Sequence, residues 1–377
     1  MNKSSLPTPY FIVYEDRLRA NLSLIADVAR RSGAKIIMAF KANALWRTFP
    51  VIAEYVRDCT ASSVNELLLG AETLGGDIHS YTPAYTDSNI DTFIKHSSHI
   101  TFNSLGQLER YGRRAAEAGV SVGVRVNPRC SVIDTDLYNP ALPGSRFGVG
   151  AEDLSAGLPP YVEGLHFHAL CESDSHDLEK VIEAFEAAFG HLLPSLKWVN
   201  MGGGHLMTRK GYDTEHLISV IRAFRERHPG LEVILEPGSA FTWQTGDLVS
   251  SVVDVVDDRG ITTAILDVSF ACHMPDTLEM PYLPAVAESV ELGEGDGIAY
   301  RLGGNSCLSG DFKGDYYFKR RPQPGDIITL RDMNHYTTVK TTMFNGVHHP
   351  DMVLCHADGE CEYLRRFGYE DYKNRMS

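Results

Sequence analysis

Short apolar runs typical of β-strands alternate with amphipathic, helix-like stretches through residues 16–235, and this alternation restricts the possible folds more than any other feature. The strand-like runs cover residues 36–40, 60–63, 78–82, 99–102, 121–126, 164–169, 198–201 and 232–235. The helix-like stretches include residues 16–31, 65–74, 104–118, 177–189 and 214–227. About eight strands separated by helices predict an α/β fold, a (β/α)8 barrel of the TIM type. An open, doubly wound sheet would give the same alternation, since one sequence does not reveal whether the sheet closes.

The pattern changes after residue 245, where strand-like runs are separated by Gly, Pro and Asp turns. These runs cover residues 248–256, 261–268, 297–302, 326–330, 337–343 and 352–356. They predict a second, mostly β domain, to which the extended residues 10–13 could add a strand. We therefore expect a barrel domain at 14–245 and a β domain formed by 1–13 together with 246–377.

The composition limits the partners of the chain. Its 377 residues include 35 Lys and Arg against 49 Asp and Glu, which gives a net charge of −14. Such a chain is not expected to bind nucleic acid or an acidic membrane surface, but it would suit a cationic substrate. No apolar run approaches the ~20 residues that span a bilayer, and the N-terminus lacks a signal-peptide pattern. The seven cysteines are scattered without C-x-x-C spacing, which predicts reduced thiols in the cytoplasm.

Lys41 directly follows the apolar run 35–40 and so lies at the C-terminal end of the first predicted barrel strand. Desolvation at such a place penalises the ammonium form and lowers the pKa of the amine. A lysine needs a lowered pKa to act as a nucleophile or to form a Schiff base. The alternative is a strand-end lysine whose ammonium simply reaches solvent.

Other chemically able residues lie at the ends of later predicted strands. They are His166 and His168 in the sixth strand, Gly202, Gly203 and Gly204 after the seventh, and Glu236 at the end of the eighth. In a barrel the C-terminal ends of the strands meet at one face, so these residues are expected to converge.

Together these residue types fit a site for pyridoxal phosphate. Consecutive glycines let backbone N–H groups approach a phosphate, and the following helix adds its dipole. Glu236 could bind a protonated pyridine nitrogen and so keep the ring an electron sink. Each residue type also has a simpler explanation, namely a loose turn for the glycines, a salt bridge within the barrel for Glu236 and packing for the histidines.

The His-x-His pair also fits a metal-dependent barrel hydrolase. Only one of His166 and His168 is expected to face the barrel interior, with the other packing against the helices. Lys41 would need carbamylation to act as a ligand, so we expect no bound metal.

Six motifs, in order along nearly the whole chain, resemble those of the pyridoxal phosphate-dependent decarboxylases of basic amino acids, which have the alanine-racemase fold. The motifs lie at residues 39–43, 167–168, 202–204, 236–238, 303–307 and, near the C-terminus, 335–337 with 344–346. The family includes the ornithine, arginine and diaminopimelate enzymes. The resemblance implies a barrel that binds pyridoxal 5′-phosphate and a β domain that completes the active site.

The resemblance also implies roles for individual residues. Lys41 would carry the cofactor, His168 would stack on its ring, and Glu236 would bind its pyridine nitrogen. The phosphate would be held by Gly202, Gly203, Gly204 and Tyr336.

Catalysis in the family involves two subunits, so the resemblance implies a homodimer with shared active sites. Cys307 would reach the active site of the partner subunit and donate a proton to Cα after CO2 has left. Lys41, Cys307 and His168 are thus the expected catalytic residues.

Within the family, the segments 270–276, 279–282 and 340–346 resemble the enzymes that decarboxylate carboxynorspermidine and carboxyspermidine to norspermidine and spermidine. Ser239 stands where the ornithine and diaminopimelate enzymes usually have an arginine, and Leu308 stands where the ornithine enzyme has an aspartate. We therefore expect a small polycationic amino acid as substrate, without a preference between the aminopropyl and aminobutyl forms.

Asp276 and Glu279 are expected to hold the amines of this substrate, and Phe344 is expected to contact it. Further candidates for contacts with cofactor or substrate are Phe102, Arg125 and Arg146. Diaminopimelate decarboxylation, a non-catalytic pyridoxal phosphate carrier and the metal-dependent hydrolase remain alternatives.

Overall fold

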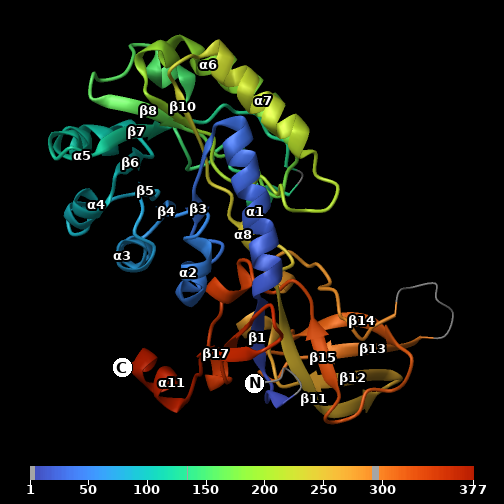
Figure 1. Cartoon of the computed structure of the whole chain (residues 1–377). Coiled ribbons are helices and arrows are strands. Elements are labelled where there is room, and N and C mark those ends of the chain that lie inside the picture. Colours follow the sequence, from blue (N-terminus) through green and yellow to red (C-terminus); the bar gives the residue numbers. More distant parts are fainter. Residues whose placement is uncertain (1–4, 134, 291–296) are drawn as a thin grey trace. The chain divides into compact units, whose positions relative to one another are not determined.

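The computed structural model describes residues 5–133, 135–290 and 297–377, so residues 1–4 of the predicted β domain lie outside the described residues. The chain divides into two compact units, Arg19–Phe241 and a second made of Met1–Leu18 with Thr242–Ser377 (Figure 1). We call them the barrel unit and the sheet unit. The domain bounds expected from the sequence, 14–245 and 1–13 with 246–377, remain a prediction.

A parallel sheet forms the barrel unit, and its strands follow one another in chain order. They are β2 (Lys35–Ile36), β3 (Met38–Ala39), β4 (Cys59–Ala61), β5 (Ile78–Tyr81), β6 (His99–Phe102), β7 (Ser121–Arg125), β8 (Val162–His166), β9 (Trp198–Asn200) and β10 (Glu232–Leu235). The segment 35–39 pairs on both sides, since β2 pairs with β10 and β3 pairs with β4. Between them, Ile37 N donates to Leu235 O at 2.9 Å. The sheet therefore closes on its first strand, which confirms the barrel and excludes the open sheet.

Helices lie around the outside of the barrel sheet (Figure 1). They are α1 (Glu15–Ser32), α2 (Phe49–Ile52), α3 (Val64–Thr73), α4 (Ile90–His96), α5 (Leu105–Glu117), α6 (Ser175–Phe189), α7 (Thr214–Arg227) and α8 (Ser239–Thr242). The first turns of α3, α5, α6 and α7 are each fixed by a side-chain oxygen that accepts a backbone N–H, from Ser63, Ser104, Asp174 and Asp213 respectively. Between β7 and β8 the described residues hold short 3₁₀ turns, Asp136–Tyr138 and Ala151–Leu154, in place of a helix.

Trp198 fills the barrel interior at the N-terminal ends of the strands. A Cβ added to Gly123 or Gly164 would come within 2.2 Å or 2.0 Å of its ring, so only glycine fits at these strand positions. The indole Nε1 donates to Ser121 Oγ at 2.9 Å, and the His99 ring packs edge-on with centroids 5.5 Å apart. Packing thus closes this end of the barrel, and the opposite end is left for chemistry.

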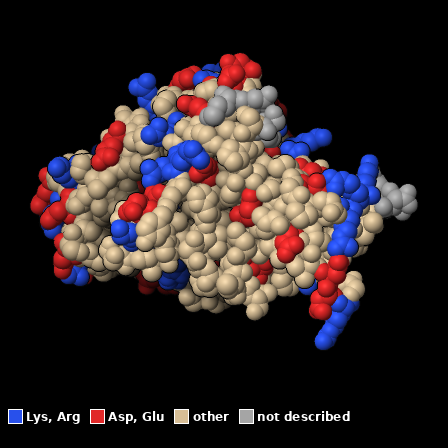
Figure 2. Space-filling view, turned by 90° about the horizontal axis from the view of Figure 1, so that it is seen from below, with Lys and Arg blue, Asp and Glu red and all other residues tan. Residues whose placement is uncertain are grey.

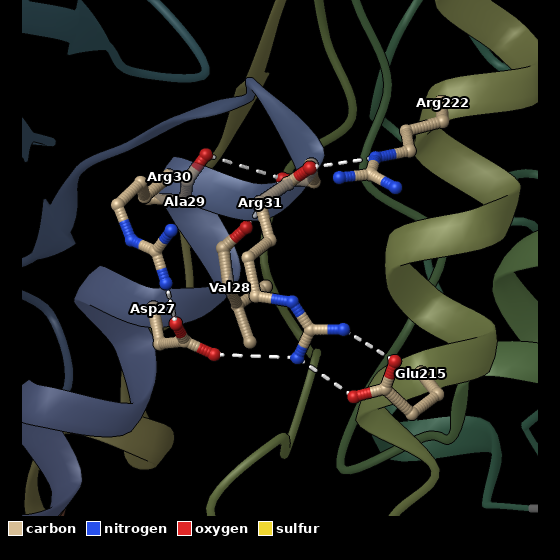
Figure 3. Close-up of polar contacts among 8 residues, drawn as sticks. Asp27, Val28, Ala29, Arg30, Arg31, Glu215 and Arg222 are labelled. Carbon is tan, nitrogen blue, oxygen red and sulfur yellow. Dashed lines mark hydrogen bonds and ion pairs between the residues drawn. The ribbon is translucent and has the colours of Figure 1, made fainter.

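The C-terminal end of α1 is held by arginines of α7. Arg222 Nε donates to the carbonyl oxygen of Arg31 at 2.7 Å (Figure 3), and Arg225 Nη1 donates to that of Ser32 at 3.0 Å. The last carbonyls of a helix lack partners within it, and guanidinium groups also suit the negative end of the helix dipole. Arg31 in turn donates to Glu215 Oε1 at 2.7 Å. The helix before the first barrel strand is thus joined to the helix before the last one.

The sheet unit is mostly antiparallel, with the strand order β14-β13-β12-β11-β1-β16-β17 and β15 paired to β11. Its strands are β1 (Tyr10–Tyr14), β11 (Gly246–Asp258), β12 (Ile261–Leu266), β13 (Ile298–Gly303), β14 (Phe312–Phe318), β15 (Ile327–Leu330), β16 (Asp351–Cys355) and β17 (Cys361–Arg365), and its helices include α9 (Phe270–His273), α10 (Asp276–Glu279) and α11 (Tyr369–Met376). β1 lies antiparallel to β11 and parallel to β16, so the N-terminal segment adds a strand as predicted. The strands β14 and β17 were not predicted.

The prediction of a strand at 337–343 is wrong. Thr337–Val339 forms a short 3₁₀ turn, entered from Tyr336 at a φ of 54°. The Thr338 hydroxyl donates to the Asn334 carbonyl at 3.2 Å, a local bond that competes with strand pairing. Threonines favoured the strand prediction through their β-branched shape, and here their hydroxyls stabilise the turn.

Within the described residues, no helix combines the length and the apolar character needed to cross a lipid bilayer. Acidic and basic side chains are interspersed on the face that Figure 2 shows. An anionic partner would therefore meet acidic groups together with basic ones on this face.

Candidate active site

Lys41 follows β3 in a tight turn, in which Ala42 N donates to Ala39 O at 3.2 Å. Its side chain is accessible to solvent, yet protein atoms surround it at the C-terminal end of the barrel strands. These surroundings lower the pKa of the amine by desolvation; the Arg125 guanidinium lowers it further, and Glu236 opposes the shift. The nucleophilic free base is therefore more populated at neutral pH than for an ordinary lysine.

The imidazole of His168 lies beside this amine, with Nε2 3.4 Å from Lys41 Nζ. Its other nitrogen, Nδ1, accepts the backbone N–H of Gly203 at 3.0 Å. Since Nδ1 accepts, the proton of the neutral ring is on Nε2 and faces the lysine. Burial, with the charges of Lys41 and Arg125, holds the pKa of His168 well below its usual value, so the ring is neutral.

His166 lies on the same side of β8 as His168, buried inside the barrel. Its ring packs edge-on against that of Tyr81 with centroids 5.3 Å apart, and its Nε2 lies 3.6 Å from Glu236 Oε2. Phe167, between the two histidines, packs instead against helix α6. The expectation that one histidine packs against the helices is therefore wrong, because residues two apart in a strand point to the same face.

Close backbone packing requires glycine at all three positions of the 202–204 loop. An added Cβ would lie 2.5 Å from a backbone oxygen at Gly202, 2.4 Å at Gly203 and 2.3 Å at Gly204. The N–H of Gly202 donates to Asn200 Oδ1 at 2.9 Å and that of Gly203 to His168 at 3.0 Å. Among the three, only the N–H of Gly204 makes no hydrogen bond within the described part of the chain. The loop is a tight, rigid turn rather than a loose one.

Glu236 is a buried carboxyl at the end of β10, and its Oε1 accepts from Asn200 Nδ2 at 2.7 Å. Burial raises the pKa of Glu236, although the Asn200 hydrogen bond and the charge of Lys41 oppose the shift. Burial also holds the pKa of His166 well below its usual value, so that imidazole supplies no cation. Within the described residues no Lys or Arg forms an ion pair with Glu236, contrary to the salt-bridge explanation. The carboxyl is free to share a proton with a base that enters the site.

Of the three further candidates from the sequence, Arg125 lies in this site. Its guanidinium carbon lies 4.7 Å from the ring centroid of Tyr81 and 4.5 Å from that of Phe147. Arg146 also lies over Phe147, at 4.3 Å, and Phe102 is a fully buried core residue.

Two residues of the site were not predicted, Asn200 and Tyr81. Asn200 is the polar residue inside the apolar run 198–201, which was a usable signal because a buried amide needs partners. The Tyr81 hydroxyl donates to Asn103 Oδ1 at 2.8 Å, which holds the ring under Arg125. An aromatic residue at a strand end carried no such signal.

The sheet unit presents Cys307 on an ordered turn after β13. Ser306 Oγ donates to Asp311 Oδ2 at 2.6 Å, and Gly304 N donates to Asp311 O at 2.7 Å. The N–H of Cys307 donates to Asn345 Oδ1 at 2.8 Å, and the cysteine side chain is exposed. An accessible thiol is thus held on a fixed backbone.

Phe344 and Tyr336 also belong to this unit. Phe344 is 50% exposed, precedes Asn345, and accepts a hydrogen bond from Cys272 Sγ through its carbonyl at 3.7 Å. Tyr336 enters the turn at Thr337–Val339. The structure therefore brings Cys307 close to residues 344–345. The spacing of the motifs along the chain could not predict this contact.

Asp276 and Glu279 are already engaged by a cation of the chain. Lys340 Nζ donates to Glu279 Oε2 at 2.6 Å and also to Asp276 Oδ1. The hydrogen bond from Lys340 lowers the pKa of Glu279. Burial alone would lower the pKa of Lys340, but its bonds to the two carboxylates outweigh this and raise it. The trio holds two negative charges and one positive charge.

Known proteins resemble the chain over almost its whole length. A profile of the family described as pyridoxal-dependent decarboxylase, C-terminal sheet domain, matches residues 11–334. The chain is 48% identical over 373 residues to a carboxyaminopropylagmatine decarboxylase of Synechocystis sp., covering 99% of this chain and 96% of that relative. It is 40% identical over 380 residues to a carboxynorspermidine/carboxyspermidine decarboxylase of Campylobacter jejuni, covering 98% of each. A crystal structure of carboxynorspermidine decarboxylase from Campylobacter jejuni, complexed with norspermidine, matches with a TM-score of 0.91 at 39% identity, over 98% of this chain and 100% of that one.

Proposed function

The chain belongs to the pyridoxal-dependent decarboxylases, and from that premise we propose that it removes CO2 from carboxynorspermidine or carboxyspermidine to give norspermidine or spermidine. The observation that carries this proposal is the near-complete likeness to an enzyme solved with norspermidine. The net negative trio of Asp276, Glu279 and Lys340 supports it, because such a trio attracts a polycation. A second candidate substrate is carboxyaminopropylagmatine, since a 48% identical relative bears that name.

The barrel residues fit the cofactor on two observations. Lys41 offers an accessible amine whose pKa is lowered, as covalent attachment requires. Glu236 offers a buried carboxyl that lacks a Lys or Arg partner within the described residues, as a pyridine nitrogen would satisfy. Gly204 would supply a backbone N–H for the phosphate, and Tyr336 remains a predicted phosphate contact.

The bound cofactor supplies a ring that accepts the electron pair left at Cα when CO2 departs. Lys41 would hold the cofactor through its amine, whose lowered pKa suits a covalent bond to an aldehyde. Glu236 would hold a proton at the ring nitrogen, and its raised pKa suits that task. His168, which is neutral and accepts a hydrogen bond from Gly203 N, would stack against the ring.

Protonation at Cα requires an acid, which we assign to Cys307 of the partner subunit. The exposure of this thiol on an ordered turn supports the assignment. The exposed apolar side chains of Leu308, Phe312 and Phe344 suit a subunit contact of a homodimer. None of the seven cysteines, all of which the structure describes, forms a disulfide, which supports a cytoplasmic location.

A substrate panel tests the proposal. Purified protein is offered carboxynorspermidine, carboxyspermidine, carboxyaminopropylagmatine, diaminopimelate, ornithine and arginine, and CO2 release is followed. We expect the highest kcat/KM with a carboxylated polyamine. Activity restricted to diaminopimelate, ornithine or arginine would contradict the proposal, and so would the absence of CO2 release from every compound.

A further inference from the structure

A group of ligating side chains lies outside the barrel, where α6 and α7 begin. His176 and Glu179 are three residues apart on α6, so they share one face of that helix, and His216 lies in the first turn of α7. One ligating atom from each residue lies within 4.8 Å of the other two. Within the described residues, this is the one group of three His, Cys, Asp or Glu donors with such spacing.

The distance between His216 and Glu179 suits an ion between them. His216 Nε2 lies 3.4 Å from Glu179 Oε2. In a tetrahedral zinc site with bonds of about 2.1 Å, two ligand atoms stand about 3.4 Å apart. The opposite ends of the same helices carry a contrasting pair, His228 Nε2 and Glu186 Oε1, at the hydrogen-bond distance of 2.7 Å. Arg227 also pairs with that second carboxylate, at 2.8 Å, which leaves no place for a metal.

The two imidazoles stack on each other, and one nitrogen of each lies within 4.8 Å of the other. Nδ1 of His216 lies 3.0 Å from Ser175 Oγ, so Nε2 is the nitrogen left to bind. Metal-bound histidines usually hold their second nitrogen in such a bond, which fixes the ring. The His176 ring lies 4.0 Å from the His216 ring, centroid to centroid.

The backbone of both histidines is fixed by the helix caps. Asp174 Oδ1 accepts from His176 N at 2.9 Å, and Asp213 Oδ1 accepts from His216 N at 2.9 Å. Both caps are acidic, so they offset the positive ends of the two helix dipoles, which would otherwise repel a cation.

We propose that His176, Glu179 and His216 bind one divalent cation of the zinc class. Two imidazoles and one carboxylate suit Zn²⁺, Ni²⁺ or Co²⁺, whereas Mg²⁺ and Ca²⁺ prefer sets of oxygen ligands. A water would complete the tetrahedron. His176 and Glu179 are exposed, so the ion enters directly from solvent.

The bound ion would restrain the cofactor end of the barrel. The loop before α6 contains His168, and the loop before α7 contains the glycines 202–204. These loops are already paired, since Ser173 N donates to Gly204 O at 2.9 Å. A cation held by the first turns of both helices adds a second tie, and this tie does not depend on which substrate is decarboxylated.

Calorimetric titration with zinc chloride tests the site, using full-length protein with its cofactor after removal of adventitious metal. Wild-type protein should bind one Zn²⁺. The His176→Ala and His216→Ala variants should each bind it at least about tenfold more weakly, and Glu179→Gln should weaken it in the same direction. His228→Gln is the matched control, an imidazole next to a carboxylate on the same helices, and it should bind Zn²⁺ like the wild type. Co²⁺ bound to the wild type should show the strong visible absorption of a tetrahedral centre.

Two outcomes would overturn the metal site. One is Zn²⁺ affinity that is equal in the wild type, His176→Ala and His216→Ala, which would locate the ion elsewhere. The other is the absence of saturable binding to the wild type up to about 1 mM. His176 and Glu179 are exposed, so His176→Ala and Glu179→Gln should keep the wild-type circular dichroism and zinc-free melting temperature.

Hydrogen exchange tests the second tie separately. Saturating Zn²⁺ should slow amide exchange in residues 167–174 and 201–213 of the wild type and not of His216→Ala. It should also raise the melting temperature of the wild type by mass action. Unchanged exchange in both loops of the zinc-saturated protein would overturn the restraint.

Discussion

The pKa values of the candidate residues are shifted toward the neutral forms in the barrel unit and toward the charged forms in the sheet unit. In the barrel unit, burial moves each pKa toward the neutral form, down for Lys41 and His168 and up for Glu236. In the sheet unit, mutual hydrogen bonds move the pKa values toward the charged forms, up for Lys340 and down for Glu279. The same residue types therefore have opposite protonation tendencies, and their surroundings make the difference.

This contrast suggests a division of labour. Groups held near neutrality can form covalent bonds and move protons at physiological pH. Groups held as ions beside solvent attract and orient a charged substrate, and they keep that capacity over a wide pH range. We therefore expect substitutions in the barrel unit to affect turnover, and substitutions of the charged trio to affect substrate affinity.

Replacement of Lys41 is expected to have the largest effect. Lys41→Ala should abolish CO2 release and remove the covalent pyridoxyl adduct that borohydride leaves on the wild type, as measured by peptide mass mapping. Lys35→Ala is the control, a lysine of the same strand segment that pairs with Asp58 at 3.1 Å and Asp77 at 3.0 Å. The control should keep the adduct. An adduct on a different lysine in the wild type would refute the assignment.

Cys307→Ala should lower turnover by about 10²–10⁴-fold, the usual contribution of a positioned acid. The cofactor absorbance should persist, because the thiol acts after CO2 has left. Cys130→Ala, at a half-buried cysteine of the barrel unit, should keep wild-type turnover. Unchanged kcat and product in Cys307→Ala would remove this cysteine from the mechanism. Mixing Lys41→Ala with Cys307→Ala protein should restore part of the activity if the sites are shared between subunits.

The convergence of the candidate residues within the barrel unit was predictable, because barrel topology brings strand ends together. Once the strands were located from their apolar runs, Lys41, His168 and Glu236 had to converge without any knowledge of side-chain contacts. The sequence could not reveal that the N–H groups of Gly202 and Gly203 donate hydrogen bonds to Asn200 and His168, because such bonds depend on the path of the loop.

Contacts between segments far apart in the sequence could not be predicted, because they too depend on the path of the chain. Lys340 is 61 residues from Glu279, and nothing in either segment predicts their pairing. The cluster of His176 and His216 joins two helices in a similar way, so a search for metal ligands at strand ends alone passed over it. The strand β14 contains the half-buried Gly314 and the exposed Asp315, which weakened its apolar pattern.

The burial of His99, at the N-terminal end of strand β6, makes the stability of the protein depend on pH. Burial, with the charge of Lys35, lowers the pKa of His99 to about 4. About one unit above pH 6.5 the histidine is almost wholly neutral in both states, and its protonation costs no stability. As the pH falls from 6.5 toward 4, His99 becomes protonated in the unfolded chain but stays neutral in the folded chain. The free energy of unfolding therefore falls, by about 2 kcal/mol at pH 5.

His99→Gln should therefore lose less stability than the wild type between pH 7.5 and pH 5, as measured by urea unfolding. His79, stacked on His99 with centroids 3.9 Å apart, also has a pKa held well below its usual value and adds to the effect in the wild type. Equal losses of stability in the two proteins would mean that protonation of His99 does not cause the pH dependence.

The charged trio should give the smallest effects, and these should appear in KM. Asp276→Asn makes the trio neutral, so it should raise KM for carboxylated polyamines about tenfold, since partial exposure weakens the contact, and leave kcat nearly unchanged. Glu370→Gln, an exposed acid of α11, should change neither constant.

The opposite change separates charge from positioning. Lys340→Gln leaves two unopposed carboxylates, so it should lower KM if the trio attracts the substrate mainly through its net charge. A KM that rises in Lys340→Gln as in Asp276→Asn would instead show that the lysine aligns the carboxylates, and the charge argument would fail. Raised ionic strength should shrink the effect of either variant, because exposed charges are screened while the buried groups around Lys41 are not.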